Sequence, residues 1–176
     1  YNEVPDVVVQ MLSALLNQTS PPAEIHVVDD GSTQGAYVEE RDWFIRQAAV
    51  ARIYATWQRT ANEGKRHAQI HGFRKIRDAD LFVTVDSDSM LDAEALHEIV
   101  QPFSDPRVMS VAGVILAINN RENLLARVTD VIFVGQQLID RSFMSQLGSV
   151  MVNSGGLAAY RCSILAENID TYLNES

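Results

Sequence analysis

The sequence is poor in cysteine and in positive charge. Among its 176 residues Cys162 is the single cysteine, so an internal disulfide is excluded, and we expect a reducing compartment and a buried, inert thiol. Lysine and arginine together number 14 against 23 aspartates and glutamates, which gives a net charge of −9. Because a nucleic-acid binder normally has a basic face, nucleic acid is not expected as a partner. An acidic chain that binds a polyanionic small molecule needs local cations or a metal ion.

Long hydrophobic runs are also missing. No apolar run reaches the ~18–20 residues needed to cross a bilayer, and no signal-peptide pattern is present. The apolar content of 47% and the charged content of 21% are those of an ordinary globular protein. The length suits one hydrophobic core, so we expect a single domain over residues 1–176. Tyr1-Asn2-Glu3 leads directly into a helix, without a preceding strand or an initiator methionine, so we expect a fragment of a longer protein.

Helical and strand patterns alternate along the chain. Apolar residues at helical spacing predict helices over 5–17, 65–77 and 122–144, and we also expect helices over the polar, mixed stretch 35–50 and over 92–100. Apolar and β-branched runs predict strands over 24–28, 51–56, 82–85, 107–119 and 150–161. The alternation indicates an α/β fold with a largely parallel sheet, because each helix carries the chain back across one face. We expect the helix over 122–144 to pack against the sheet, with a membrane interface or partner helices as the alternative.

Two carboxylates directly follow the strand FVTV. Asp86 and Asp88 are separated by one serine, so a turn can bring both to the edge of the sheet where ligands bind in α/β folds. Close like charges favour an intervening cation, and Mg²⁺ takes one or two protein carboxylates together with substrate phosphate oxygens. The pair therefore indicates a metal–diphosphate site, with Asp88 as the first candidate for a direct ligand and Asp86 toward the sugar or ribose. A solvated turn is the structural alternative.

Two further motifs place charged residues at the end of a strand and at the start of a helix. VVDDGS ends its strand at Asp29 and Asp30, and an aspartate there can accept a hydrogen bond from the imide N–H of uracil, although capping of the next helix is a competing role. NEGKR places Lys65 and Arg66 at a helix start, where backbone N–H groups and a mobile positive charge favour an anion. A solvent-exposed basic pair is the plainer interpretation of this motif.

Read together, the motifs form an ordered series. YNE, VVDDGS, NEGKRHA, VDSDS and NSGGLAAYR follow one another over nearly the whole chain. This series resembles the catalytic domain of the family-two inverting glycosyltransferases with the GT-A fold, and is most similar to processive membrane synthases of the hyaluronan and chitin type. The resemblance implies a Rossmann-like, nucleotide-sugar-binding sheet with helices on both faces, whose first strand is truncated here.

The resemblance also implies roles for individual residues. It puts Tyr1 and Glu3 beside the nucleotide, Asp29 or Asp30 on the uracil, and Lys65, with Arg66, on the uridine diphosphate. Asp86 and Asp88 match the family's DxD element, which holds the diphosphate through Mg²⁺ or Mn²⁺. The segment formed by Ser154, Gly155 and Gly156 matches one that approaches the donor sugar and the acceptor, with Tyr160 and Arg161 as structural neighbours.

The function implied is transfer of a sugar from a UDP-sugar, UDP-GlcNAc or UDP-GlcA, to a growing glycan acceptor with inversion. We expect the full-length protein to be attached to a membrane through segments outside this soluble fragment, with this domain on the cytoplasmic face. The carboxylate motif that supplies the family's general base, and the QxxRW motif that follows it, do not occur up to Ser176. We therefore expect the base after Ser176 and no turnover by the fragment alone.

Two other functions remain open. A phosphotransferase of the haloacid-dehalogenase type also has a hydrophobic strand followed by DxD, with Asp86 as nucleophile and Asp88 as acid/base; it would leave VVDDGS and NEGKR without roles. A non-catalytic nucleotide-sugar-binding module would keep the fold but not the activity.

Overall fold

The computed structural model of the chain describes residues 1–33, 35, 37–114, 128, 131–132, 134–148 and 156–174. The N-terminal half contains α1 (Pro5–Leu16), β1 (Glu24–Asp29), α2 (Val38–Ala51), β2 (Tyr54–Arg59), α3 (Lys65–Phe73) and β3 (Leu81–Val85). The C-terminal half contains α4 (Ala95–Val100), a 3-10 turn (Gln101–Ser104), β4 (Ser110–Ala112), a π-helical segment (Gln136–Asp140), α6 (Arg141–Gln146), β5 (Leu157–Arg161) and α7 (Cys162–Asn174). The alternation confirms the predicted α/β class.

The strands form two small sheets. β1 and β2 run parallel, in register from Glu24 with Tyr54 to Asp29 with Arg59. In the other sheet β5 lies between β3 and β4 and is antiparallel to both. The prediction of a largely parallel sheet is therefore wrong for β5. The antiparallel direction has a structural consequence, because it brings the beginning of β5 beside the end of β3, where the DSD motif starts.

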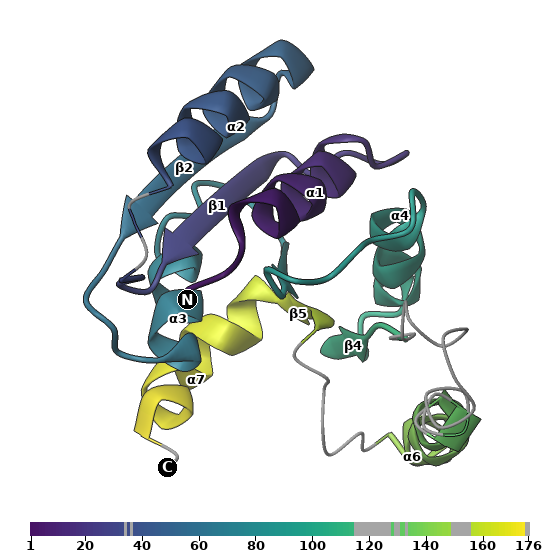
Figure 1. The fold of residues 1–176 in the computed structure, drawn as a ribbon. Coiled ribbons are helices and arrows are strands. Elements are labelled where there is room, and N and C mark those ends of the chain that lie inside the picture. The colour runs from purple at the N-terminus through teal and green to yellow at the C-terminus, as the bar shows by residue number, and fades with distance from the viewer. Residues whose placement is uncertain are drawn as a thin grey trace.

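Helices cover both sides of the strands (Figure 1). α1 and α2 contact each other on one side, whereas α3, which packs on β1, and α7 lie together on the other. α1 begins at Pro5, which suits a first helical turn, and buries one apolar face into the core. Leu12 of this face and Phe44 of α2 are fully buried. Each such side chain contributes about 1.5–3 kcal/mol through burial, so the apolar periodicity of these two helices accounts for their docking.

The two sheets do not share a hydrogen-bonded ladder within the described residues. An apolar cavity of about 470 Å³ lies between the strands β1 and β3 and is bordered by α1 and α4. Residues of all four elements, including Leu12, Ile25, Val83 and Leu96, belong to one hydrophobic cluster. The sheets are therefore held in place by helix packing around this cavity.

Several helices and strands begin or end at other residues than predicted. β2 begins three residues later than the predicted start at 51, because α2 continues through Ala51, and α3 ends at Phe73, short of 77. The predicted strand 107–119 is found as Ser110–Ala112, and its positions 115–119 lie outside the described residues. The predicted strand 150–161 is found as Leu157–Arg161, and 150–155 are outside the described residues as well.

The predicted helix 122–144 is helical wherever it is described, but the apolar residues described there do not pack against the sheet as predicted. Ile139 and Phe143 are 71% and 64% exposed, and α6 makes its main contacts with the π-helical segment that precedes it. Figure 1 shows α6 on the side of the molecule that carries β4, away from the sheet of β1 and β2. Helical spacing predicts the helix here but does not identify what its apolar residues contact. No helix in the described part of the chain is long and apolar enough to span a membrane.

Candidate functional site

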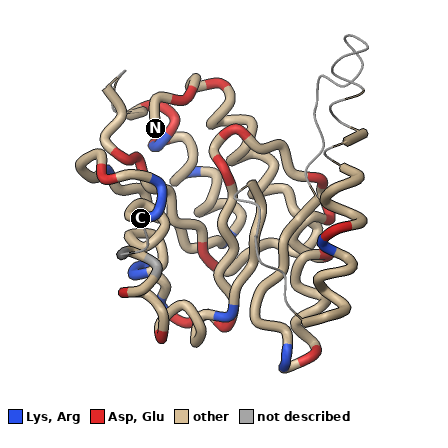
Figure 2. The backbone as a smooth tube through the Cα atoms, turned by 90° about the horizontal axis from the view of Figure 1, so that it is seen from below, with Lys and Arg blue, Asp and Glu red and all other residues tan. Residues whose placement is uncertain are grey.

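A second cavity, of about 450 Å³, opens at the carboxyl ends of β1 and β3. Its lining combines residues from the N-terminus, β1, α3 and the turn after β3. Six of the predicted site residues line it, namely Tyr1, Glu3, Asp30, Lys65, Asp86 and Asp88. The fold therefore collects in one place four motifs that are up to 87 residues apart in the sequence. Figure 2 shows acidic positions spread over the whole described backbone, so a lysine in this cavity faces an acidic background.

The DSD motif forms a tight turn supported by the start of β5. The Asp86 N–H donates to the carbonyl oxygen of Gly156 at 3.1 Å, and the Ser89 N–H donates to the Asp86 carbonyl at 3.1 Å. The Ser89 hydroxyl donates to the same Gly156 carbonyl at 3.4 Å. Gly156 of the predicted donor and acceptor segment thus contacts the DSD turn directly. Ser154 and Gly155 lie outside the described residues.

Lys65 connects α3 to this turn. Its Nζ lies 2.5 Å from Asp86 Oδ1, and the two side chains are 55% and 30% exposed. Among the described residues that line the cavity, Lys65 is the only lysine or arginine. Asp88 is exposed and makes no hydrogen bond or ion pair with another described residue. One carboxylate of the DSD motif is thus neutralised by Lys65 and the other faces solvent at the cavity.

Asp29 and Asp30 have different surroundings although they are adjacent. The Asp29 side chain is 2% exposed and does not line the cavity. Its Oδ1 accepts the Ser32 N–H at 2.9 Å, and its Oδ2 lies 3.5 Å from Arg59 Nε. Asp29 therefore stabilises the turn that follows β1.

Asp30 points the other way, into the cavity lining and toward the loop before α3. Its Oδ1 accepts the Glu63 N–H at 3.0 Å and its Oδ2 accepts the Gly64 N–H at 2.9 Å. The Thr60 hydroxyl donates to Oδ1 at 3.4 Å. The carboxylate of Asp30 thus accepts the N–H groups of the two residues that immediately precede α3.

Asn2 is a site residue that the sequence analysis missed. Its Oδ1 accepts the Thr33 N–H at 2.8 Å, its Nδ2 donates to Thr33 Oγ1 at 3.1 Å, and its N–H donates to Ser32 Oγ at 2.9 Å. Its φ is 56°, a left-handed conformation that asparagine tolerates better than most residues. Asn2 therefore fixes Tyr1 and Glu3 against the turn after β1. The asparagine in YNE, a residue type that tolerates this backbone conformation, was the sequence signal that could have identified this role.

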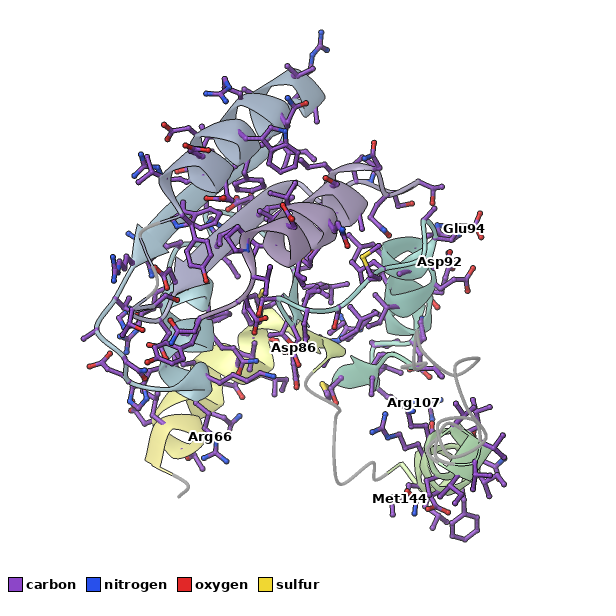
Figure 3. The ribbon with its side chains drawn as sticks, viewed as in Figure 1. Arg66, Asp86, Asp92, Glu94, Arg107 and Met144 are labelled. Carbon is purple, nitrogen blue, oxygen red and sulfur yellow. The ribbon has the colours of Figure 1, made fainter. Side chains whose placement is uncertain are left out.

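Arg66 and Arg161, like Asp29, do not line the cavity. Arg66 is exposed and absent from the lining, and Figure 3 shows it beyond the lower end of α3, well away from Asp86. Arg161, which was expected only as a structural neighbour of the segment 154–156, connects two parts of the fold. Its guanidinium donates to the carbonyl oxygens of Phe103 at 2.9 Å, Asp105 at 3.1 Å and Val108 at 2.8 Å, which holds the connection between α4 and β4 onto β5.

The donor set suits a hard divalent cation that is shared with a ligand. No group of three or more His, Cys, Asp or Glu side chains converges on one point in the described residues. Asp86 and Asp88 nevertheless line the same cavity and offer carboxylate oxygens only. Mg²⁺ and similar ions are held by one or two carboxylates when phosphate oxygens and water complete the shell. The residues present therefore fit such an ion together with a phosphate ligand.

Comparisons with known proteins agree on one family. The sequence profile of glycosyl transferase family 2 matches residues 1–169. A hyaluronan synthase of Streptococcus pyogenes is 34% identical over 177 residues, which cover 100% of this chain and 42% of that protein. An N-acetylglucosaminyltransferase of Bradyrhizobium diazoefficiens is 32% identical over 98% of this chain and 35% of its own length. The chain thus spans less than half the length of these relatives.

A solved structure supports the GT-A fold. A mannosyltransferase from Pyrobaculum calidifontis, in complex with GDP-Man and Mn²⁺, superposes with a TM-score of 0.74. The match covers 95% of this chain and 44% of that one, at 22% sequence identity. The predicted Rossmann-like GT-A architecture is confirmed by this similarity.

Proposed function

The chain belongs to glycosyl transferase family 2, and we propose that its 450 Å³ cavity binds the nucleotide and diphosphate of a UDP-sugar donor. The proposal rests on which residues line this cavity. Near the end of β1 it offers an aromatic ring, Tyr1, and an acid, Asp30; near the end of β3 it offers Lys65 and the two DSD carboxylates. In a donor of this class a flat base and its ribose are followed by a charged diphosphate that carries the sugar, so the base and the diphosphate match the two parts of the lining.

Asp30, rather than Asp29, is the candidate for the base contact. Asp29 is buried behind the turn and already bonded to Ser32, whereas Asp30 lines the cavity. A carboxylate oxygen has two lone pairs, so Asp30 can accept from the imide N–H of uracil while it keeps its backbone donors. Tyr1, which Asn2 fixes beside the same turn, offers its exposed ring as a stacking surface.

Asp88, with Asp86, would hold Mg²⁺ or Mn²⁺ together with the diphosphate. When bound, the ion neutralises the negative charge that builds on the leaving diphosphate. Lys65 supplies a second positive charge from α3, and such preorganised charges are usually the largest contribution to catalysis. Asp88 is the better direct ligand because Asp86 is shared with Lys65.

The proposed reaction is an inverting sugar transfer. An acceptor hydroxyl attacks the anomeric carbon from the face opposite UDP; the new glycosidic bond forms while the bond to the diphosphate breaks. A general base takes the hydroxyl proton, a contribution of about 10²–10⁴-fold. No motif that the family resemblance assigns to this base occurs within residues 1–176, so we do not expect these residues alone to turn over. The segment at Gly156 would face the donor sugar and the acceptor.

The full-length protein is proposed to be a membrane polysaccharide synthase that uses UDP-GlcNAc or UDP-GlcA on the cytoplasmic face. This rests on the similarity to a hyaluronan synthase and an N-acetylglucosaminyltransferase. The family match rules out the haloacid-dehalogenase alternative. A non-catalytic nucleotide-sugar-binding module remains the second candidate.

A panel of labelled UDP-sugars, incubated with the full-length protein and Mn²⁺, tests the proposal. We expect incorporation into a glycan from UDP-GlcNAc or UDP-GlcA, and none with residues 1–176 alone. Donor binding without transfer by the full-length protein would favour the non-catalytic module. Absence of UDP-sugar binding would overturn the proposal. Sustained transfer by residues 1–176 alone would refute the expectation that the general base lies outside these residues.

A further inference from the structure

We propose that Asp30 is a positioning residue that aims Lys65 at the diphosphate end of the cavity. The inference rests on the proposed function and adds a role for Asp30 that needs no contact with the base. Asp30 belongs to the turn after β1, whereas Lys65 is the first residue of α3, 35 positions later in the chain. The loop 60–64 joins them in space.

The contacts of Asp30 hold this loop at its last two residues. Oδ1 accepts the Glu63 N–H at 3.0 Å and Oδ2 accepts the Gly64 N–H at 2.9 Å, so both oxygens of a buried carboxylate are used. Hydrogen bonds to a charged group are stronger than those between neutral groups. They fix the N–H groups of the two residues that immediately precede Lys65.

The turn and the loop are also packed backbone to backbone. The Thr60 N–H donates to the Asp29 carbonyl at 2.9 Å. Gly31, at φ +72°, lies so close to the loop that a Cβ there would meet Asn62 N at 2.7 Å. The loop therefore packs on the turn at both ends, and Asp30 holds the end next to α3.

Gly64 connects the fixed loop to α3. It is the residue before α3, with φ +94° and ψ 163°, and its carbonyl accepts the Ala68 N–H at 3.1 Å, the first bond of the helix. Its position fixes the direction in which Lys65 leaves the backbone. Lys65 Nζ then reaches Asp86 Oδ1 at 2.5 Å across the cavity. A continuous path of bonds thus runs from Asp30 through Gly64 and Lys65 to the DSD turn.

Two possible roles of Asp30 predict opposite changes in anion affinity when its charge is removed. If Asp30 acted on phosphate only through its own charge, its neutralisation would strengthen binding of an anion, because like charges repel. If Asp30 positions Lys65, the same change weakens anion binding. A ligand without a base makes the distinction clean, since Asp30 then has no base to contact.

The experiment measures binding of inorganic pyrophosphate with Mn²⁺ to the full chain by titration calorimetry. We expect Asp30→Asn to weaken pyrophosphate binding about tenfold, the range of one charge-assisted phosphate contact. Adding Lys65→Ala to Asp30→Asn should then cost little more, because both changes remove the same contact. Pyrophosphate affinity that is unchanged or higher in Asp30→Asn, while UDP affinity falls, would overturn the inference and leave Asp30 as a base contact only.

A glycine variant tests the same path without altering Asp30. A Cβ at Gly64 would have no atom within 4 Å, so Gly64→Ala acts only through its positive φ, and it should also weaken pyrophosphate binding. Gly148→Ala is the matched control, with φ +69° and equal space but remote from the cavity lining. If Asp30→Asn does not fold, Gly64→Ala decides: wild-type pyrophosphate affinity in that variant refutes the inference. If the wild-type chain binds neither UDP nor pyrophosphate with Mn²⁺, the proposed function falls and the inference with it.

Discussion

Lys65 and Asp86 form an ion pair across the cavity, with Nζ 2.5 Å from Oδ1. The pair joins the first residue of α3 to the turn after β3, so it links two motifs that are 21 positions apart in sequence. Its partners are half and one-third exposed, and exposed pairs of this kind contribute about 0–1 kcal/mol to stability. Its importance therefore lies in the positive charge that it keeps beside the DSD carboxylates.

Lys65→Met should separate stability from binding. We expect the free energy of unfolding to change by less than about 1 kcal/mol, because the pair is exposed, and UDP affinity to fall about tenfold, because a phosphate contact is lost. Thermal unfolding and calorimetry with UDP measure the two effects. A large loss of stability, with UDP affinity retained, would mean that Lys65 is structural.

Asp29→Asn should have the opposite profile. The side chain is buried, accepts the Ser32 N–H and forms an ion pair with Arg59, so we expect a loss of about 1–3 kcal/mol in the free energy of unfolding. UDP affinity should change little, since Asp29 does not line the cavity. Chemical denaturation and UDP titration test this, and a tenfold loss of UDP affinity at full stability would put Asp29 in the nucleotide site.

Asn2→Ala should loosen the N-terminal residues. It removes the side-chain bonds to Thr33 that hold Tyr1 beside the turn after β1. We expect uridine and UDP to bind about three- to tenfold more weakly, the range of one lost hydrogen bond, while pyrophosphate affinity stays at the wild-type value. An equal loss for all three ligands would show that the effect is not confined to the base end.

Cys162 should react slowly with thiol reagents. Burial, together with the charge of Asp80, raises the pKa of its thiol above the ordinary value of 9.0. Since the thiolate is the reactive form, a raised pKa lowers its fraction at any pH below that pKa, and alkylation should accelerate only at higher pH than for a free thiol. Rates of iodoacetamide labelling from pH 7 to 10 check this against glutathione. Labelling as fast as that of glutathione at pH 8 would contradict it.

The parts of the site that follow from local chemistry could be predicted from sequence. The DSD turn and the helix beginning at Lys65 are set by residues close together in the chain, and both are found where they were predicted. The different roles of Asp29 and Asp30 could not be predicted. Adjacent strand residues point to opposite sides, and which side faces the cavity depends on how β1 sits against β2 and α3.

The direction of β5 and the environment of α6 were beyond sequence reasoning for a similar reason. A strand pattern has the same period whichever way the strand runs, so Leu157–Arg161 does not reveal that it lies antiparallel to β3. Likewise the spacing of Ile139 and Phe143 defines an apolar helix face but not its partner. The motif order was informative because it connects segments that only the fold brings together.

The central claim is that the DSD carboxylates bind a divalent ion together with the diphosphate. Calorimetry of UDP binding with and without Mn²⁺, for the wild-type chain and for Asp88→Asn, tests it most directly, with Glu94→Gln as a control that removes an exposed acid far from Asp86 (Figure 3). We predict that Mn²⁺ strengthens UDP binding to the wild type and to Glu94→Gln, and that this gain disappears in Asp88→Asn. An undiminished Mn²⁺-dependent gain in Asp88→Asn would contradict the account.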